Sequence, residues 1–454
     1  MKAIRNAVLG GLAAVFVAGA GTAETLTEAL VTAYENSNLL DKNRATLRAT
    51  DEDVAQAVSL LRPVLNFVAS ASDTDVSAYQ GSLSLTAGLT LYEGGRNRLG
   101  VEAAKENVLA TRAALVTVEQ DVLFDAVSAY MDMRAEAQSV RLAENSLRLT
   151  REELRAAEDR FEVGEVTRTD VSLAESRVAE ARSRLVAAQG ALEVARARYF
   201  LAIGAYPANL QAPPPAPEIP ATLEAAKALA NQNHPAIKQV QHLVKAAEIN
   251  VERARAAKLP RVELGASLSR NRSVAQGTTS YGDVARGELS VTVPIYQGGR
   301  LDSAQRQAMA NAESVRAELL QTSLTIEDAV ARAWAQLEVA RASITARQQQ
   351  IRAAELAFEG VREEAKLGAR TTLDVLDAEQ ELLTARNDLV QARRDEYVAV
   401  YALLSAMGLL TTDHLGLQVA GYDPSAYYNA VRNAPVHSIQ GKRLDRVLER
   451  SGRN

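Results

Sequence analysis

The sequence predicts a mainly α-helical chain built from two copies of one unit, each combining a β-hairpin with a long antiparallel coiled-coil hairpin. Three observations lead to this prediction. The segment from Phe161 to Arg182 returns 204 residues later as the segment from Ala365 to Arg386. The junctions LYEGGR and IYQGGR are related by the same offset. Long heptad-patterned runs flank both, so the length of the chain arises from duplication rather than from unrelated domains.

Each repeated segment is expected to form the tip of a helical hairpin. One glycine, Gly164 in the first copy and Gly368 in the second, ends the heptad run. The pattern then restarts with a Thr that lies three residues before an Asp, in both copies. This is the spacing of a capping box, in which the two side chains satisfy the first backbone N–H groups of a new helix.

The arms of these hairpins are too long for one globular domain. Residues 97–162 would form a helix of roughly 100 Å at the usual rise per residue. In the return arm, Val171, Val178 and Leu185 step by seven, with alanines between them. Small residues at every second seam position let two helices approach closely, so each copy is expected to form one coiled-coil hairpin.

The period changes from helical to alternating in two places, which predicts β-hairpins at 64–92 and 261–296. In the first, leucines such as Leu85 and Leu89 alternate with small polar residues. Turns are expected near 73–77 and 277–283. Alternation alone indicates a half-buried soluble sheet more often than a membrane barrel. Here the four strands each approach the ~9 to 11 residues that span a bilayer, and Tyr92 and Tyr296 follow where interfacial aromatics are expected, which favours a barrel.

The remaining segments divide the chain. Residues 1–23 combine a basic start, an apolar run and small residues at the cleavage positions, as in a signal peptide. Helices are expected at 26–61 and 223–259, each ending before a proline. The predicted parts are the signal peptide at 1–23, a first repeat at 24–210, a Pro-rich linker at 211–220, a second repeat at 221–410 and a peripheral, partly disordered tail at 411–454.

Composition excludes several classes of function. Lys plus Arg number 51 against 56 Asp plus Glu, a net charge of −5, which offers no basic surface for nucleic acid. The chain has no Cys, so it can form neither a disulfide nor a lipidated N-terminal cysteine. Nucleophile-elbow, phosphate-loop and metal-binding motifs are missing from the sequence. We therefore expect no catalytic residue, metal or cofactor.

Four strands cannot enclose a pore, and an open sheet edge in lipid leaves backbone groups unpaired, so the chain is expected to oligomerise. With its YxGGR junctions and its tips VGEVTRTD and LGARTTLDVLDA, the sequence resembles the TolC-like outer-membrane efflux protein family over nearly all of residues 24–410. The resemblance implies a homotrimer in the outer membrane. Its four strands per chain complete a 12-stranded β-barrel, and its helical hairpins form an α-barrel tunnel in the periplasm.

The resemblance also implies a function and partners. Members of this family act as passive exit ducts of tripartite efflux pumps and type I secretion systems. They work with a periplasmic adaptor (membrane fusion) protein and an inner-membrane pump or ABC transporter. A non-transporting coiled-coil scaffold of the envelope and an enzyme are the alternatives, and a scaffold has no need for two amphipathic β-hairpins.

The family's functional positions fall at the hairpin tips. The matching residues are Arg370, Thr169 and Asp170 for the lock of the closed tunnel, Asp374 and Asp377 for a cation-selective carboxylate ring, and Val163, Gly164, Leu367 and Gly368 for adaptor docking. An aromatic hydroxyl of the family's lock falls on Ala365, so the lock is expected to be weaker. From spacing alone, Asp170 and Asp374 are more simply helix caps. Asp377 lies one turn further in and escapes that interpretation.

Overall fold

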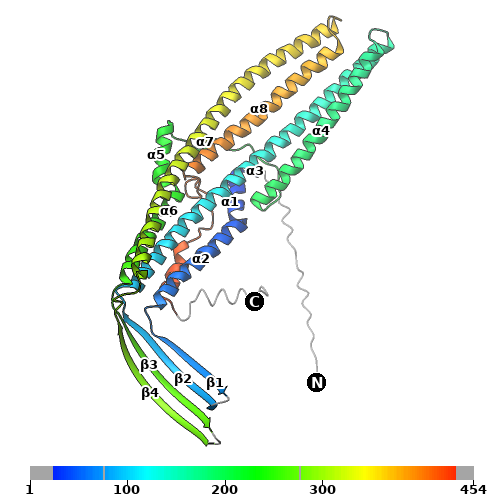
Figure 1. The fold of residues 1–454 in the computed structure, drawn as a ribbon. Coiled ribbons are helices and arrows are strands. Elements are labelled where there is room, and N and C mark those ends of the chain that lie inside the picture. Colours follow the sequence, from blue (N-terminus) through cyan, green and yellow to red (C-terminus); the bar gives the residue numbers. More distant parts are fainter. Residues whose placement is uncertain (1–23, 75–76, 276–277, 436–454) are drawn as a thin grey trace, which may run out of the picture.

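The protein is described here from a computed structural model that covers residues 24–74, 77–275 and 278–435. The expected signal peptide and residues 436–454 of the expected tail lie outside these ranges. The molecule is long and slightly bent (Figure 1), with a β-sheet at one end and the tips of two helical hairpins at the other. This arrangement confirms the predicted fold class of long helical hairpins combined with four strands.

The two hairpins are near copies. In the first, α3 (Arg96–Glu162) packs against α4 (Arg168–Ile203), and in the second α7 (Arg300–Lys366) packs against α8 (Thr372–Ala406). Both α3 and α7 contain 67 residues and run from the sheet to the tips. Alanines fill the seams as the heptads predict, since Ala174, Ala181 and Ala385 are buried.

Four shorter helices lie beside the hairpins nearer the sheet: α1 (Leu26–Asn36), α2 (Asn38–Ser59), α5 (Leu223–Asn233) and α6 (Pro235–Ala256). The prediction of one continuous helix at 26–61 and another at 223–259 was wrong. Ser37 has an extended backbone and its side chain accepts a hydrogen bond from the Leu40 N–H, so it caps a new helix. In the second copy His234 is extended because Pro235 follows it, and the proline opens α6.

The sheet is antiparallel in the order β1 (Val64–Thr74), β2 (Ser77–Tyr92), β3 (Arg261–Ala275) and β4 (Thr278–Thr292). The β2–β3 pairing joins the two copies. The turn expected at 277–283 was misplaced, because β4 already begins at Thr278, which pairs with Ala275. The start of β4 is polar, a composition that is also typical of turns, and this explains why the turn was placed there.

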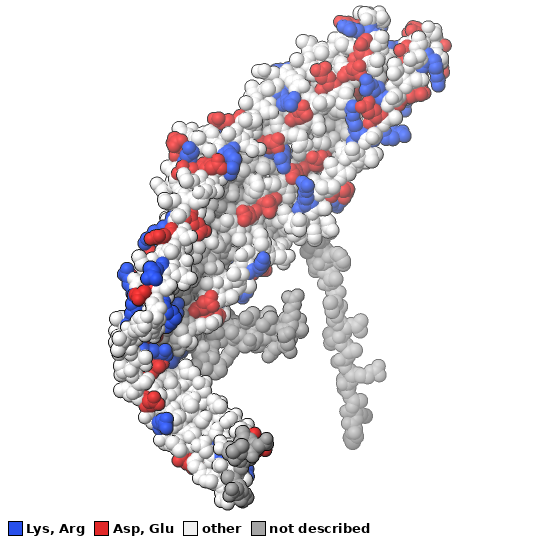
Figure 2. Space-filling model, viewed as in Figure 1, with Lys and Arg blue, Asp and Glu red and all other residues white. Residues whose placement is uncertain are grey.

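The strand register sorts the sheet into one apolar and one polar face. Leu85 pairs with Leu268 and Leu89 with Leu264, whereas Ser84 pairs with Ser269 on the opposite face. Most of the sheet is free of charge in Figure 2, while charges of both signs cover the helices.

The main core lies where both hairpins meet the short helices. Its largest fully buried side chains include Tyr130 and Tyr199. The Tyr130 hydroxyl is 3.0 Å from the carbonyl oxygen of Glu24 and 2.9 Å from that of Gln211, which ties the start of the chain and the linker to α3. No helix of the described ranges has an apolar stretch long enough to cross a membrane.

Part of the expected tail is regular structure. Residues 424–431 form α9 (Pro424–Val431), capped by Asp423, and this helix packs on α2. The Tyr427 hydroxyl donates a 2.6 Å hydrogen bond to a Glu52 carboxylate oxygen. Eight residues are too few to show a helical period, although the Asp-Pro start is a recognisable cap.

Candidate functional site at the hairpin tips

Both tips turn on a glycine and restart in a capping box. Gly164 and Gly368 have φ angles of 81° and 75°, in the left-handed region that other residues avoid. The Asp170 carboxylate accepts the Thr167 N–H at 2.8 Å, and the Thr167 hydroxyl accepts the Asp170 N–H at 3.3 Å.

The second tip repeats the box with Thr371 and Asp374, at 2.9 and 3.2 Å. These hydrogen bonds hold the pKa of both Asp170 and Asp374 below the usual range of an aspartate. The largest effect comes from the backbone N–H groups of Thr167 and Thr371. The helix-cap interpretation of these two residues is therefore confirmed.

Helix α8 packs into the groove of the first hairpin near its tip. Leu376 is buried against Ala157 of α3 and Ala174 of α4, with Leu154 beside them. Both alanines are fully buried, so the helices are in close contact here. Near the tips this small apolar cluster joins the two hairpins of one chain, and polar contacts lie on both of its flanks.

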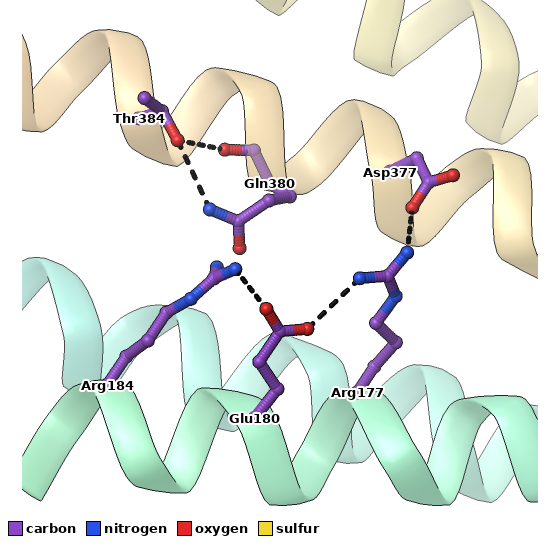
Figure 3. A network of polar contacts seen from close by, with 6 residues as sticks. All are labelled: Arg177, Glu180, Arg184, Asp377, Gln380 and Thr384. Atoms are coloured by element: carbon purple, nitrogen blue, oxygen red, sulfur yellow. Dashed lines mark hydrogen bonds and ion pairs between the residues drawn. The ribbon is translucent and has the colours of Figure 1, made fainter.

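On one flank, Asp377 contacts the other hairpin. Its Oδ1 atom lies 2.5 Å from Nη2 of Arg177 on α4. Arg177 also donates to Glu180 at 3.0 Å, and Glu180 in turn accepts from Arg184 at 2.5 Å (Figure 3). The pKa of Glu180 is lowered, first by its hydrogen bond from Arg177. In this conformation the charge of Asp377 is thus offset by a guanidinium of its own chain.

Arg177 was missed by the sequence reasoning. It lies beside the heptad seam of α4, where charged residues are ordinarily solvated, and only the packing of α8 on this hairpin brings Asp377 to it.

The three predicted lock residues do not bond one another within the described part of one chain. Arg370 Nε donates to Glu364 Oε2 at 2.9 Å, within its own tip, and this carboxylate raises the pKa of the guanidinium. Thr169 is exposed. Arg370 and Asp170 nevertheless line the same hollow of about 560 Å³ between the two tips, so both sides of the predicted lock face a shared space.

On the other flank lies a buried carboxyl group, Glu379. Its side chain is 6 % exposed, and its Oε1 atom has no hydrogen-bond partner within the described residues. Burial, reinforced by the nearby Glu153, raises the pKa of Glu379 to about 7, although a hydrogen bond with Ser146 and the charges of Arg148 and Arg362 act in the opposite direction. A group that titrates near neutral pH therefore lies in the contact between the hairpins.

The outermost residues of the tips are apolar and exposed. Val163 and Leu367, which precede the two tip glycines, are 71 % and 86 % exposed. A Cβ atom added at Gly164 or Gly368 would meet nothing within 4 Å, so these glycines serve the turn and leave the surface open.

Comparison with known proteins finds one family whose model matches both copies of the repeat. The model of the outer membrane efflux protein family matches residues 29–205 and 227–409. The chain belongs to the outer membrane efflux protein family. This confirms the resemblance found in the sequence, and it places the chain in the outer membrane, in a family of channels rather than of enzymes.

Relatives and solved structures agree with this assignment. The outer membrane efflux protein BepC of Brucella suis is 39 % identical over 418 residues, which cover 91 % of this chain and 92 % of BepC. The alkaline protease secretion protein AprF of Pseudomonas aeruginosa is 30 % identical over 208 residues, 45 % of this chain and 43 % of AprF. A crystal structure of CusC superposes with a TM-score of 0.74 at 21 % identity, over 85 % of this chain and 92 % of CusC, and supports the fold.

Proposed function

We propose that three copies of this chain form an outer-membrane channel-tunnel, the passive exit duct of a tripartite efflux pump or type I secretion system, gated at its periplasmic tip. The observation that carries the proposal is the open four-stranded sheet with one apolar face. Both β1 and β4 are edge strands in the single chain. Such edges are unstable in lipid unless another chain pairs with them, and three chains of four strands give a closed barrel of 12.

The helices support the same assembly. Exposed apolar side chains follow the outer faces of the hairpins, which a neighbouring chain would cover. They include Val186, Val194 and Leu201 on α4 and Leu320, Leu324, Val339 and Leu356 on α7. The names of BepC and AprF refer to efflux and to protease secretion, respectively, and both activities need an outer-membrane exit.

In the proposed gate, the second hairpin moves against the first. Closing keeps Leu376 between α3 and α4 and keeps Asp377 on Arg177, while Arg370 turns to Asp170 or Thr169 on a neighbouring hairpin. Opening separates Asp377 from Arg177. In the trimer, the three copies of Asp374 and Asp377 form a ring of six carboxylates at the narrow end. Such a ring attracts cations, and its mutual repulsion is relieved when a multivalent cation binds.

Two sets of variants separate these roles. Arg370→Ser is expected to raise conductance by loosening the tip. Asp374→Asn combined with Asp377→Asn is expected to abolish cation preference and block. Unchanged selectivity and block in the double variant would mean that Asp374 acts only as a helix cap and Asp377 only as the partner of Arg177.

The proposed docking site for the periplasmic adaptor is the pair of exposed tips, Val163-Gly164 and Leu367-Gly368, where apolar side chains face solvent. Adaptor crosslinks from probes beside these residues are the expected result. Crosslinks that map to Tyr92 or Tyr296, at the membrane end, would reverse the proposed orientation.

Crosslinking between edge strands distinguishes the duct from a coiled-coil scaffold. The chain has no native Cys, so pairs of cysteines scanned along β1 and β4 report only the designed contacts. A closed barrel of three chains gives covalent products that stop at the trimer. A scaffold gives no β1–β4 products, and a different closed ring gives a different limit.

A further inference from the structure

The duplication places the same two charged groups between a shorter and a longer helix in both copies. Helices α2 and α6 each contain 22 residues, and α3 and α7 each contain 67. Counted from the first residue of each helix, Glu248 on α6 takes the place of Asp51 on α2. Arg316 on α7 takes the place of Arg112 on α3 in the same way. The groove between α6 and α7 is therefore the counterpart of the groove between α2 and α3.

In the first copy, helix α9 fills this groove. The ring of Tyr428 lies 5.0 Å from the guanidinium carbon of Arg112 and packs on the apolar cluster around Val54 and Val108. Asp51 is fully buried in the first copy, and Val431 at the end of α9 is buried as well. A short C-terminal segment of the chain is thus what a groove of this shape accepts.

In the second copy, the counterpart groove is open. A hollow of about 490 Å³ lies there, and its lining includes Ile249, Met309 and Arg316. Arg316 pairs with Glu248 at 2.6 Å, and the two side chains are 56 % and 45 % exposed, in contrast to the buried Asp51. Because the repeat places both pairs of helices in the same way, both grooves open on the same side of the helical layer.

The open groove differs from the filled one in its chemistry. Ile249 replaces Glu52, which binds the Tyr427 hydroxyl of α9 in the first copy, and Met309 replaces Lys105. Glu313 also lines the groove, and within the described residues it has no basic partner, whereas the other two carboxylates of the groove are paired with arginines. The groove therefore suits a segment that carries apolar and basic side chains.

The end of the chain has this composition. Residues 436–454, which lie outside the described ranges, contain five Lys or Arg and two Asp or Glu. Leu444, Val447 and Leu448 recur three and four positions apart, a spacing typical of amphipathic segments.

The described chain also ends close enough to the open groove. Arg62, just after α2, donates to the carbonyl oxygen of Ala434. Asn97 at the start of α3 donates to the Leu60 carbonyl oxygen at 3.3 Å, and Leu99 of the same helix lines the open groove. Packed helix axes lie roughly 10 Å apart, so the path across α3 and α6 is on the order of 20 to 30 Å. About twelve residues of extended chain span roughly 40 Å, which is sufficient.

We propose that residues 436–454 dock in the α6–α7 groove of the same chain, with apolar side chains on Ile249 and Met309 and basic side chains beside Glu313. The C-terminal segment then covers both copies of the repeat, with α9 on the first copy and the last residues on the second. This inference rests on the internal duplication of the fold and is independent of transport and gating.

The test is disulfide formation in the full-length protein, which has no native Cys. Met309→Cys combined with Val447→Cys is expected to form an intrachain disulfide at least about tenfold faster than a control pair. The reason is that a docked segment holds the two Cα atoms within the roughly 4 to 7 Å that a disulfide requires. The control pair is Lys105→Cys with Val447→Cys, since Lys105 holds the position of Met309 in the filled groove.

This control separates docking from chance encounters. Met309 is 41 % exposed and the Lys105 side chain is 40 % exposed, so an undocked segment would reach both positions. Glu313→Lys, an exposed substitution, is expected to slow the reaction of the Met309 pair severalfold, because a basic side chain then faces the basic segment. Equal rates for the two pairs, products that run mainly as dimers on a non-reducing gel, or no effect of Glu313→Lys would overturn the proposal.

Discussion

Replacement of Glu379 by Gln is expected to remove the pH dependence of the contact between the two hairpins. The pKa of this buried carboxyl is raised from 4.5 to about 7. A raised pKa means that its contribution to the packed state is fully present below 4.5 and is lost as the pH rises through 7. If an open tip lets water reach Glu379, the packed arrangement loses about 1.4 kcal/mol between pH 6 and pH 8.

This change corresponds to about a tenfold fall, for each of the three chains, in the ratio of the packed to the open tip. Open probability in planar bilayers at pH 6 and pH 8 measures it directly. The wild-type channel should open more at pH 8, and Glu379→Gln should be equally closed at both values because its amide does not ionise. The control is Glu381→Gln, an exposed neighbour on the same helix. A Glu379→Gln channel with the full pH response of the wild type would refute this reasoning.

Three further outcomes are expected. Arg177→Gln should raise open probability only modestly, because the ion pair is partly exposed and its loss should shift the closed–open equilibrium by up to about 1 kcal/mol. Unchanged gating would show that this ion pair does not stabilise the closed tip. Leu85→Asp should destabilise the barrel by roughly 2 kcal/mol in chemical unfolding from membranes, whereas Ser84→Asp on the opposite face should cost much less, and equal costs would indicate a soluble sheet. Gly408→Ala should lower the melting temperature, because φ is +75° and the new Cβ would lie 2.6 Å from the His234 Cα, whereas Gly360→Ala in open space should not.

Much of the fold could be predicted from the sequence because periodicity and duplication report local structure. Heptads predicted both hairpins, and strict alternation predicted which residues share a sheet face. The break at Ser37 escaped detection because Asn36, Ser37 and Asn38 include neither glycine nor proline, and the helical pattern continues on both sides of them. Helix α9 escaped because its eight residues are shorter than the window in which a period appears.

The site could be predicted only in part, for a physical reason. Capping boxes are local, so Asp170 and Asp374 were placed correctly as caps. The contacts of Arg177, Asp377 and Glu379 arise from packing between hairpins that lie about 200 residues apart in the sequence. The heptad pattern of a two-helix hairpin assigns all three residues to solvated positions. They become buried or paired only because the second hairpin packs on the first.

The central claim is that this chain forms a pore, and single-channel recording of the purified full-length protein in a planar bilayer tests it most directly. The account predicts discrete conductance steps from heat-modifiable trimers, with cation preference and with block by a multivalent cation added on the side of the hairpin tips. A protein that inserts as a stable trimer yet gives no conductance steps, with Arg370→Ser as silent as the wild type, would contradict it.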